Sequence, residues 1–172
     1  MKPSRRSLVL GLVNFGGGLA MTSGFQWFYL TASWAGLRPL EPMAATGQVH
    51  PFNNHGVLYV SDGDLAASNL LFAVILAAGG LGLACVLIAE RMGLRNVLKA
   101  APIALRWRAA ILGMQFVPLL VALSIPGSFD TDRNGIAAVA PLLAINVAFS
   151  AVAALIASAL SARAEAAPAQ LP

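Results

Sequence analysis

"LAASNLLFAVILAAGGLGLACVLIA", residues 65–89, is a stretch of 25 residues without one charged side chain. An α-helix needs about 20 consecutive apolar residues to cross the hydrocarbon core of a bilayer. Three more uncharged runs share this character: residues 7–37, 109–129 and 134–162. They do not alternate in hydrophobicity as the strands of a membrane barrel do. Each run can cross a bilayer once, so we predict four spans: about residues 8–31, 65–89, 108–127 and 136–161.

The composition of the whole chain agrees with these runs. Of the 172 residues, 58% are hydrophobic and only 10% are charged, whereas soluble domains carry about 25% charged residues. So few charges cannot cover the surface of a soluble globule of this size. We therefore predict an all-α membrane protein, in which a single four-helix transmembrane bundle takes up the whole chain, residues 1–172.

The basic residues predict the orientation of the bundle. Nine of the eleven lie before the first span, between the second and third spans, or after the fourth, and Lys and Arg collect on the cytoplasmic side. Both termini are then cytoplasmic, with these connections: outer loops 32–64 and 128–135, inner loop 90–107 and cytoplasmic tail 162–172. Because the topology explains the net charge of +4, the basic residues indicate no nucleic-acid partner. No Gly-rich phosphate loop is present, so we expect no nucleotide.

The first outer loop contains a hairpin pattern, "GQVHPFNNHGVLYVSDGD" at residues 47–64. Residues suited to β-strands stand on both sides of the turn-forming pair at 53–54. We expect a small β-hairpin, which must lie on the helices or on a partner because an isolated hairpin is marginal in water. Ser61 or Asp62 is placed to cap the following helix, and Asp64 in its first turn suits the helix dipole.

Two of the predicted spans carry small residues at helical spacing. The candidate helix-packing residues are Gly16, Ala20 and Gly24 in the first span and Gly80 and Ala84 in the second. Small side chains let another helix backbone approach closely. The contact can be made inside the bundle or with a foreign helix.

Both histidines of the protein, His50 and His55, lie in the first outer loop. Two histidines five residues apart are a weak basis for a metal site, because zinc needs three or four ligands. A histidine here either holds the loop by hydrogen bonds or takes part in chemistry. A lipid or quinone site at the outer leaflet would be lined by His55, Gln26, Trp27, Tyr29 and Asp62.

A calcium-loop pattern occurs in the second outer loop. "DTDRNG" at residues 130–135 matches the opening D-x-[DN]-x-[DN]-G of such a loop. The match then fails, because the twelfth position is Pro141 and not the bidentate Glu. A divalent cation (Ca²⁺) joining the two outer loops would take its ligands from Asp130, Asp132, Asn134, Asp62 and Asp64. The alternative is an ordinary polar turn followed by a helix cap.

The middles of the predicted spans contain no Asp, Glu, Lys, Arg or His. Proton relays, ion-coupled transporters and voltage sensors need ionisable groups inside the membrane, and haem held by two histidines of the bundle needs them on helices. The sequence therefore argues against these classes. A lone cysteine, Cys85, excludes a thiol-oxidising quinone enzyme that works with paired cysteines.

One stretch of the first outer loop carries a resemblance. It covers roughly 25 residues, and the matching positions are Arg38, Pro39, Gly47, Asn54, His55, Gly56, Tyr59, Val60 and Ser61. The pattern resembles the outer loops of small bacterial four-helix inner-membrane proteins that carry an Asn-His-Gly motif. This resemblance implies a multi-pass protein of the bacterial inner (cytoplasmic) membrane and no particular activity. It makes His55 the more notable of the two histidines.

Two functions remain open from the sequence. The first is a non-catalytic accessory or scaffold subunit of a larger bacterial inner-membrane complex, with membrane lipids and other membrane subunits as its partners. The lack of ionisable groups in the spans and the small-residue faces favour this reading. The second is a small membrane enzyme or a lipid- or quinone-binding protein, with its site at the outer leaflet near His55.

Overall fold

The computed structural model describes residues 4–53, 56–93, 105–124 and 130–166. Its long helices are α1 (Arg5–Leu37), α2 (Asp62–Arg91), α3 (Leu105–Ser124) and α5 (Ile136–Ala166). The shorter elements are a 3-10 turn η1 (Ala44–Thr46), strands β1 (His50–Asn53) and β2 (Val57–Val60), and a one-turn helix α4 (Thr131–Asn134). The helical fold and the small antiparallel hairpin predicted from the sequence are confirmed.

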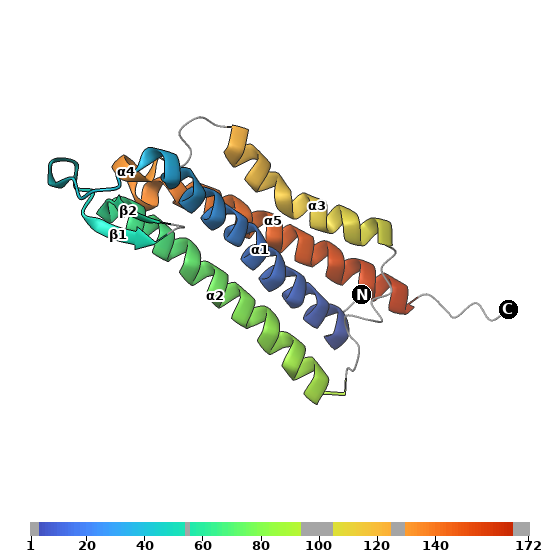
Figure 1. Cartoon of the computed structure of the whole chain (residues 1–172). Coiled ribbons are helices and arrows are strands. Elements are labelled where there is room, and N and C mark those ends of the chain that lie inside the picture. The colour runs from blue at the N-terminus through green and yellow to red at the C-terminus, as the bar shows by residue number, and fades with distance from the viewer. Residues whose placement is uncertain (1–3, 54–55, 94–104, 125–129, 167–172) are drawn as a thin grey trace.

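Helix α1 is the central helix of the bundle. It packs along α2 and α5, while α3 lies against α5 and α1 on the side away from α2 (Figure 1). Glycine permits these approaches: a Cβ at Gly16 would lie 2.6 Å from the carbonyl oxygen of Ala78, and a Cβ at Gly11 would lie 3.1 Å from that of Ala154. The backbone of α1 therefore meets α2 on one side and α5 on another.

Three helices, α1, α2 and α5, are long and apolar enough to cross a membrane. The apolar part of α3, Ala109–Val121, is shorter than the span predicted at 108–127, whose last residues, 125–127, fall outside the described residues. Large apolar side chains such as Leu76, Leu83 and Leu155 are exposed on the outside of the helices. Polar side chains such as Gln26 and Asn146 are buried between them, as expected for a bundle whose surroundings are apolar.

The hairpin is fixed to one end of the bundle. Leu58 and Val60 of β2 join Leu30 and Trp34 of α1 in one buried cluster. The ring of Phe52 in β1 meets that of Trp34 edge-on, with centroids 5.0 Å apart. We call this the hairpin end: the end of the bundle that carries residues 38–64 and α4.

Candidate functional site

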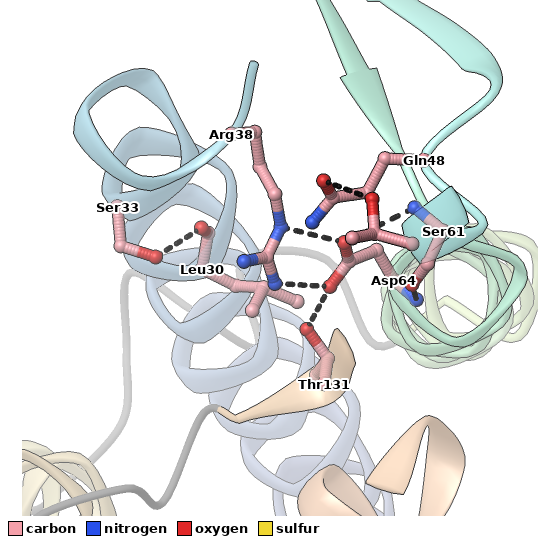
Figure 2. Close-up of polar contacts among 8 residues, drawn as sticks. Leu30, Ser33, Arg38, Gln48, Ser61, Asp64 and Thr131 are labelled. Atoms are coloured by element: carbon pink, nitrogen blue, oxygen red, sulfur yellow. Dashed lines mark hydrogen bonds and ion pairs between the residues drawn. The ribbon is translucent and has the colours of Figure 1, made fainter. Parts of the chain in front are cut away.

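An ion pair between Arg38 and Asp64 forms the centre of the hairpin end. Arg38 follows the last residue of α1, and Asp64 lies in the first turn of α2. The guanidinium donates from Nε to Oδ2 at 2.7 Å and from Nη2 to Oδ1 at 2.8 Å (Figure 2). The Asp64 side chain is fully buried and that of Arg38 is nearly so. Paired, planar contacts of this kind fix both the distance and the relative orientation of the two groups.

Two more donors complete the environment of the Asp64 carboxylate. Thr131, the first residue of α4, donates its hydroxyl to Oδ1 at 2.5 Å (Figure 2). The backbone N–H of Ser61 donates to Oδ2 at 3.3 Å, and the Ser61 hydroxyl accepts from the Asp64 N–H at 3.2 Å. This reciprocal arrangement is a capping box at the start of α2. The carboxylate thus ties α1, α2 and α4 together.

These contacts decide the charge state of Asp64, which precedes the predicted span 65–89. Burial alone would raise the pKa of the carboxyl, because it disfavours the charged form. The hydrogen bonds from Arg38 and Thr131 and the nearby positive charge of Arg38 outweigh burial and lower the pKa of Asp64 below its ordinary value. Asp64 is therefore an anion that is saturated with donors.

Close backbone packing holds α4 against α2. A Cβ at Gly63 would lie 2.5 Å from the carbonyl oxygen of Thr131 and 3.2 Å from the Cα of Gly135. Gly135, between α4 and α5, has a φ of +51°, which L side chains rarely adopt. Both glycines are thus needed for the corner that brings Thr131 to Asp64.

A second polar contact, between His50 and Asp62, lies on the surface beside the first. His50 Nε2 in β1 is 2.7 Å from Asp62 Oδ1 at the start of α2. The two side chains are 38% and 93% exposed, so water screens the pair and it contributes at most about 1 kcal/mol. It links the hairpin to α2 without burying either group.

The residues expected to line a lipid or quinone site do not converge in the described part of the chain. Gln26 is buried between α1 and α5, where its Oε1 accepts from Asn146 Nδ2 at 2.8 Å. The indole N–H of Trp27 donates to the Ser68 hydroxyl of α2 at 2.9 Å. Tyr29 is 44% exposed on the outside of α1, and Asp62 faces His50. His55 lies outside the described residues.

Some of the proposed cation ligands are hydrogen-bonded within the chain, and one buried carboxylate oxygen is not. Asp64 has its four hydrogen bonds, and the Asn134 amide donates to the backbone carbonyl of Asp130 at 3.3 Å. Asp132 Oδ1 is buried without a hydrogen-bond partner among the described residues. Burial lowers the pKa of Arg38, but Asp64, Asp132 and Asp130 together raise it above its ordinary value.

Acidic residues of both loops, Asp64 in one and Asp130 and Asp132 in the other, thus interact electrostatically with the guanidinium of Arg38. In the described part of the chain, no group of three or more His, Cys, Asp or Glu side chains is placed to hold a metal ion. Calcium binding by "DTDRNG" stays a sequence prediction.

The candidate helix-packing residues lie in unlike surroundings. Gly16 is buried against α2, and a Cβ at Gly79 would lie 3.9 Å from the Ala20 side chain. A Cβ at Gly24 or at Gly80 would meet nothing within 4 Å. Ala84 is exposed and lines a cavity of about 400 Å³ on the side of α2, together with Leu87, Ile88, Glu90 and Arg91.

The sequence did not predict the Arg38–Asp64–Thr131 cluster. Asp64 was assigned to the helix dipole and to a cation, and Arg38 only to an outer-loop pattern. A usable signal was present: Arg38 and Arg133 are the two basic residues that the predicted topology leaves on the outer side. Arg38 directly follows the apolar run 7–37, and a cation that is buried at the end of an apolar helix needs a carboxylate partner.

Comparisons with known proteins give no relative. No family model matches the sequence, and neither the curated proteins nor the solved structures contain a match. The function must therefore be argued from the residues and their geometry.

Proposed function

We propose that this chain is a non-catalytic accessory or scaffold subunit of a larger complex in the bacterial inner membrane. One observation carries the proposal: among the described residues, several polar side chains that could do chemistry are bonded to one another. Arg38 holds Asp64, His50 holds Asp62, and Trp27 holds Ser68. Such groups stabilise the relative positions of helices and hairpin and leave few of their donors and acceptors for a substrate.

The membrane location rests on the division of polar and apolar surface. In a bilayer, polar side chains favour the interior of a bundle, where they hydrogen-bond between helices. Gln26 of α1 and Asn146 of α5 form such a pair, and both side chains are buried. We infer four spans with both termini cytoplasmic, α3 being the shortest of the four.

A partner is suggested by the limited burial of α2. This helix packs mainly along α1, and only 22% of its most apolar window is buried. Membrane lipids cover such a face in a monomer, and the spans of other subunits cover it in a complex. We favour other subunits. The polar groups named above are bonded within the chain, so the exposed apolar face of α2 is a surface left for a functional contact, and another span fits such a face.

The test is extraction in a mild detergent followed by native mass spectrometry. An accessory subunit should be recovered with at least one other membrane protein at a fixed ratio. Recovery as a lone monomer, with no partner in chemical cross-linking of intact cells, contradicts the proposal. Topology is tested in a Cys85→Ser background, in which Ala45→Cys in the exposed outer loop should react with a membrane-impermeant maleimide.

A lipid- or quinone-binding protein is the second candidate. It is supported by large rings on the outside of α1: Phe25, Phe28 and Tyr29 are all exposed, and aromatic side chains collect at membrane interfaces. Purified protein should then retain a lipid or quinone in native mass spectrometry, and Tyr29→Ala should lower that retention. Unchanged retention in Tyr29→Ala and in His55→Ala argues against this candidate.

A further inference from the structure

The loop between α1 and the hairpin exposes apolar side chains at its tip. Residues 40–47, "LEPMAATG", are all exposed, with Leu40 74% and Met43 46% accessible to solvent. Figure 1 shows this loop projecting past the ends of the helices, on the side of the hairpin. We call it the 40–47 loop. Its side chains add little to the burial that stabilises the fold.

The loop nevertheless has a conformation fixed by its own hydrogen bonds. Met43 and Gln48 form an antiparallel bridge, with Met43 N–H to Gln48 O at 2.9 Å and Gln48 N–H to Met43 O at 3.2 Å. The Thr46 hydroxyl lies 3.1 Å from Met43 O and 3.0 Å from Gln48 Oε1. Gly47 supplies the positive φ of +74° that closes the turn. The buried Gln48 side chain anchors the base of the loop.

This combination is suited to binding. A loop that is already ordered loses less conformational entropy when it binds, so more of the contact energy appears as affinity. Leucine and methionine supply apolar area, and the flexible thioether adapts to irregular pockets. An exposed and internally fixed apolar tip therefore favours a docking element over a simple connection.

The neighbouring strand edge is closed to a partner. Tyr59 donates its backbone N–H to Pro39 O at 2.9 Å, so the hydrogen-bonding groups of residue 59 point away from β1. Pro51 is paired with Tyr59, and in an antiparallel pair its backbone groups point away from β2. Proline has no N–H to donate there. Strand addition at β1 is therefore disfavoured.

We propose that the 40–47 loop inserts Leu40 and Met43 into an apolar pocket on the extramembrane part of a partner subunit. This rests on the proposed function and specifies its docking surface. The hairpin end carries four acidic residues against two arginines, and Arg38 is already paired with Asp64. The rim of the pocket on the partner is therefore basic, facing Glu41 and Asp62.

The experiment uses the full-length chain in its native membrane. Met43 is replaced by the photo-crosslinking amino acid p-benzoylphenylalanine, and the irradiated membranes are extracted in mild detergent. In parallel, Leu40→Asp/Met43→Asp is compared with Val57→Asp, an apolar residue of β2 that is 53% exposed. Since all three side chains are exposed, the melting temperatures of the variants should match that of the wild type.

The expected result has three parts. The crosslink joins residue 43 to the protein recovered at a fixed ratio with the wild type. Leu40→Asp/Met43→Asp lowers that recovery at least tenfold, and Val57→Asp changes it less than twofold. Glu41→Lys lowers the recovery of the partner about threefold. If its recovery is unchanged, the claim that the pocket has a basic rim is wrong.

Other outcomes overturn the inference. A crosslink to lipid, a crosslink to a second copy of the chain, or full recovery with Leu40→Asp/Met43→Asp refutes docking by this loop while the accessory role stands. If no protein is recovered at a fixed ratio with the wild type, the proposed function fails and the docking surface fails with it.

Discussion

Asp64→Asn removes the negative charge from the centre of the hairpin end and leaves the shape of the side chain almost unchanged. The carboxylate accepts two hydrogen bonds from Arg38, one from Thr131 and one from the Ser61 N–H. A carboxamide has one oxygen, and its NH₂ group would face donors of the guanidinium. Arg38 then keeps its charge, at 10% side-chain exposure, without its bonded anion.

The magnitude follows from the burial of the pair. Removing one partner of a buried ion pair costs about 3–5 kcal/mol, because the other charge is left uncompensated. The charges of Asp130 and Asp132 still act on Arg38, so we expect the lower end, about 3 kcal/mol. For a chain of this size that corresponds to a fall of about 6–12 °C in Tm.

Thermal unfolding in detergent, followed by circular dichroism, measures this fall. The matched control is Asp62→Asn, which removes the same charge two residues away from a side chain that is 93% exposed. It should change stability by less than about 1 kcal/mol. The double variant Arg38→Met/Asp64→Leu should be less destabilised than Asp64→Asn, because it leaves neither charge of the pair buried without the other. Equal melting temperatures for Asp64→Asn and Asp62→Asn would refute the reasoning.

Three further predictions concern pH and the helix contacts. Because the folded pKa of Asp64 lies below its ordinary value of 3.8, its stabilisation is full above that value and is lost as the pH falls through the folded pKa. The difference in Tm between wild type and Asp64→Asn should therefore shrink between pH 6 and pH 3, and a constant difference would contradict the assignment. Gly16→Val should destabilise the bundle by about 1–3 kcal/mol, since its Cβ would lie 2.6 Å from Ala78 O. Gly17→Val is the control, because a Cβ at Gly17 meets nothing within 4 Å. Equal unfolding temperatures for Gly16→Val and Gly17→Val would contradict the close contact between Gly16 and α2. Gln26→Leu should cost about 1 kcal/mol by leaving the buried Asn146 amide unpaired, and Gln26→Leu/Asn146→Leu should recover part of that loss in the same assay.

Local patterns predicted the elements of this fold well. The uncharged run at 65–89 lies inside α2, Asp62–Arg91, because a long apolar segment between charges has few alternatives to a helix. The hairpin could be predicted because strand-forming residues flank a turn-forming pair. Each signal lies within one continuous stretch of sequence, so no knowledge of the tertiary arrangement was needed.

Contacts between distant residues could not be predicted in the same way. Arg38 and Asp64 are 26 residues apart, and Gln26 and Asn146 are 120 residues apart. Gly16 and Gly24 looked equivalent in sequence, yet a Cβ would clash at the first and meet nothing at the second. Helices cross at an angle, so they touch over only part of a small-residue face. The crossing angle and position decide which small residues are in contact, and the spacing of glycines in the sequence does not reveal them.

The positions of the buried ion pair and the exposed loop suggest why the hairpin end is built of polar bonds. Arg38 connects directly to the 40–47 loop through Pro39, and its guanidinium is held by Asp64 in the first turn of α2. The same carboxylate accepts the hydroxyl of Thr131 in α4. A partner that binds Leu40 and Met43 would therefore be connected to three helices, because Arg38, Asp64 and Thr131 meet at the Asp64 carboxylate. An apolar contact in the place of the ion pair could be equally stable, but it would fix the direction of Arg38 less strictly than two parallel hydrogen bonds do. On this argument the pair orients the loop, and Asp64→Asn should weaken partner recovery even where the protein remains folded.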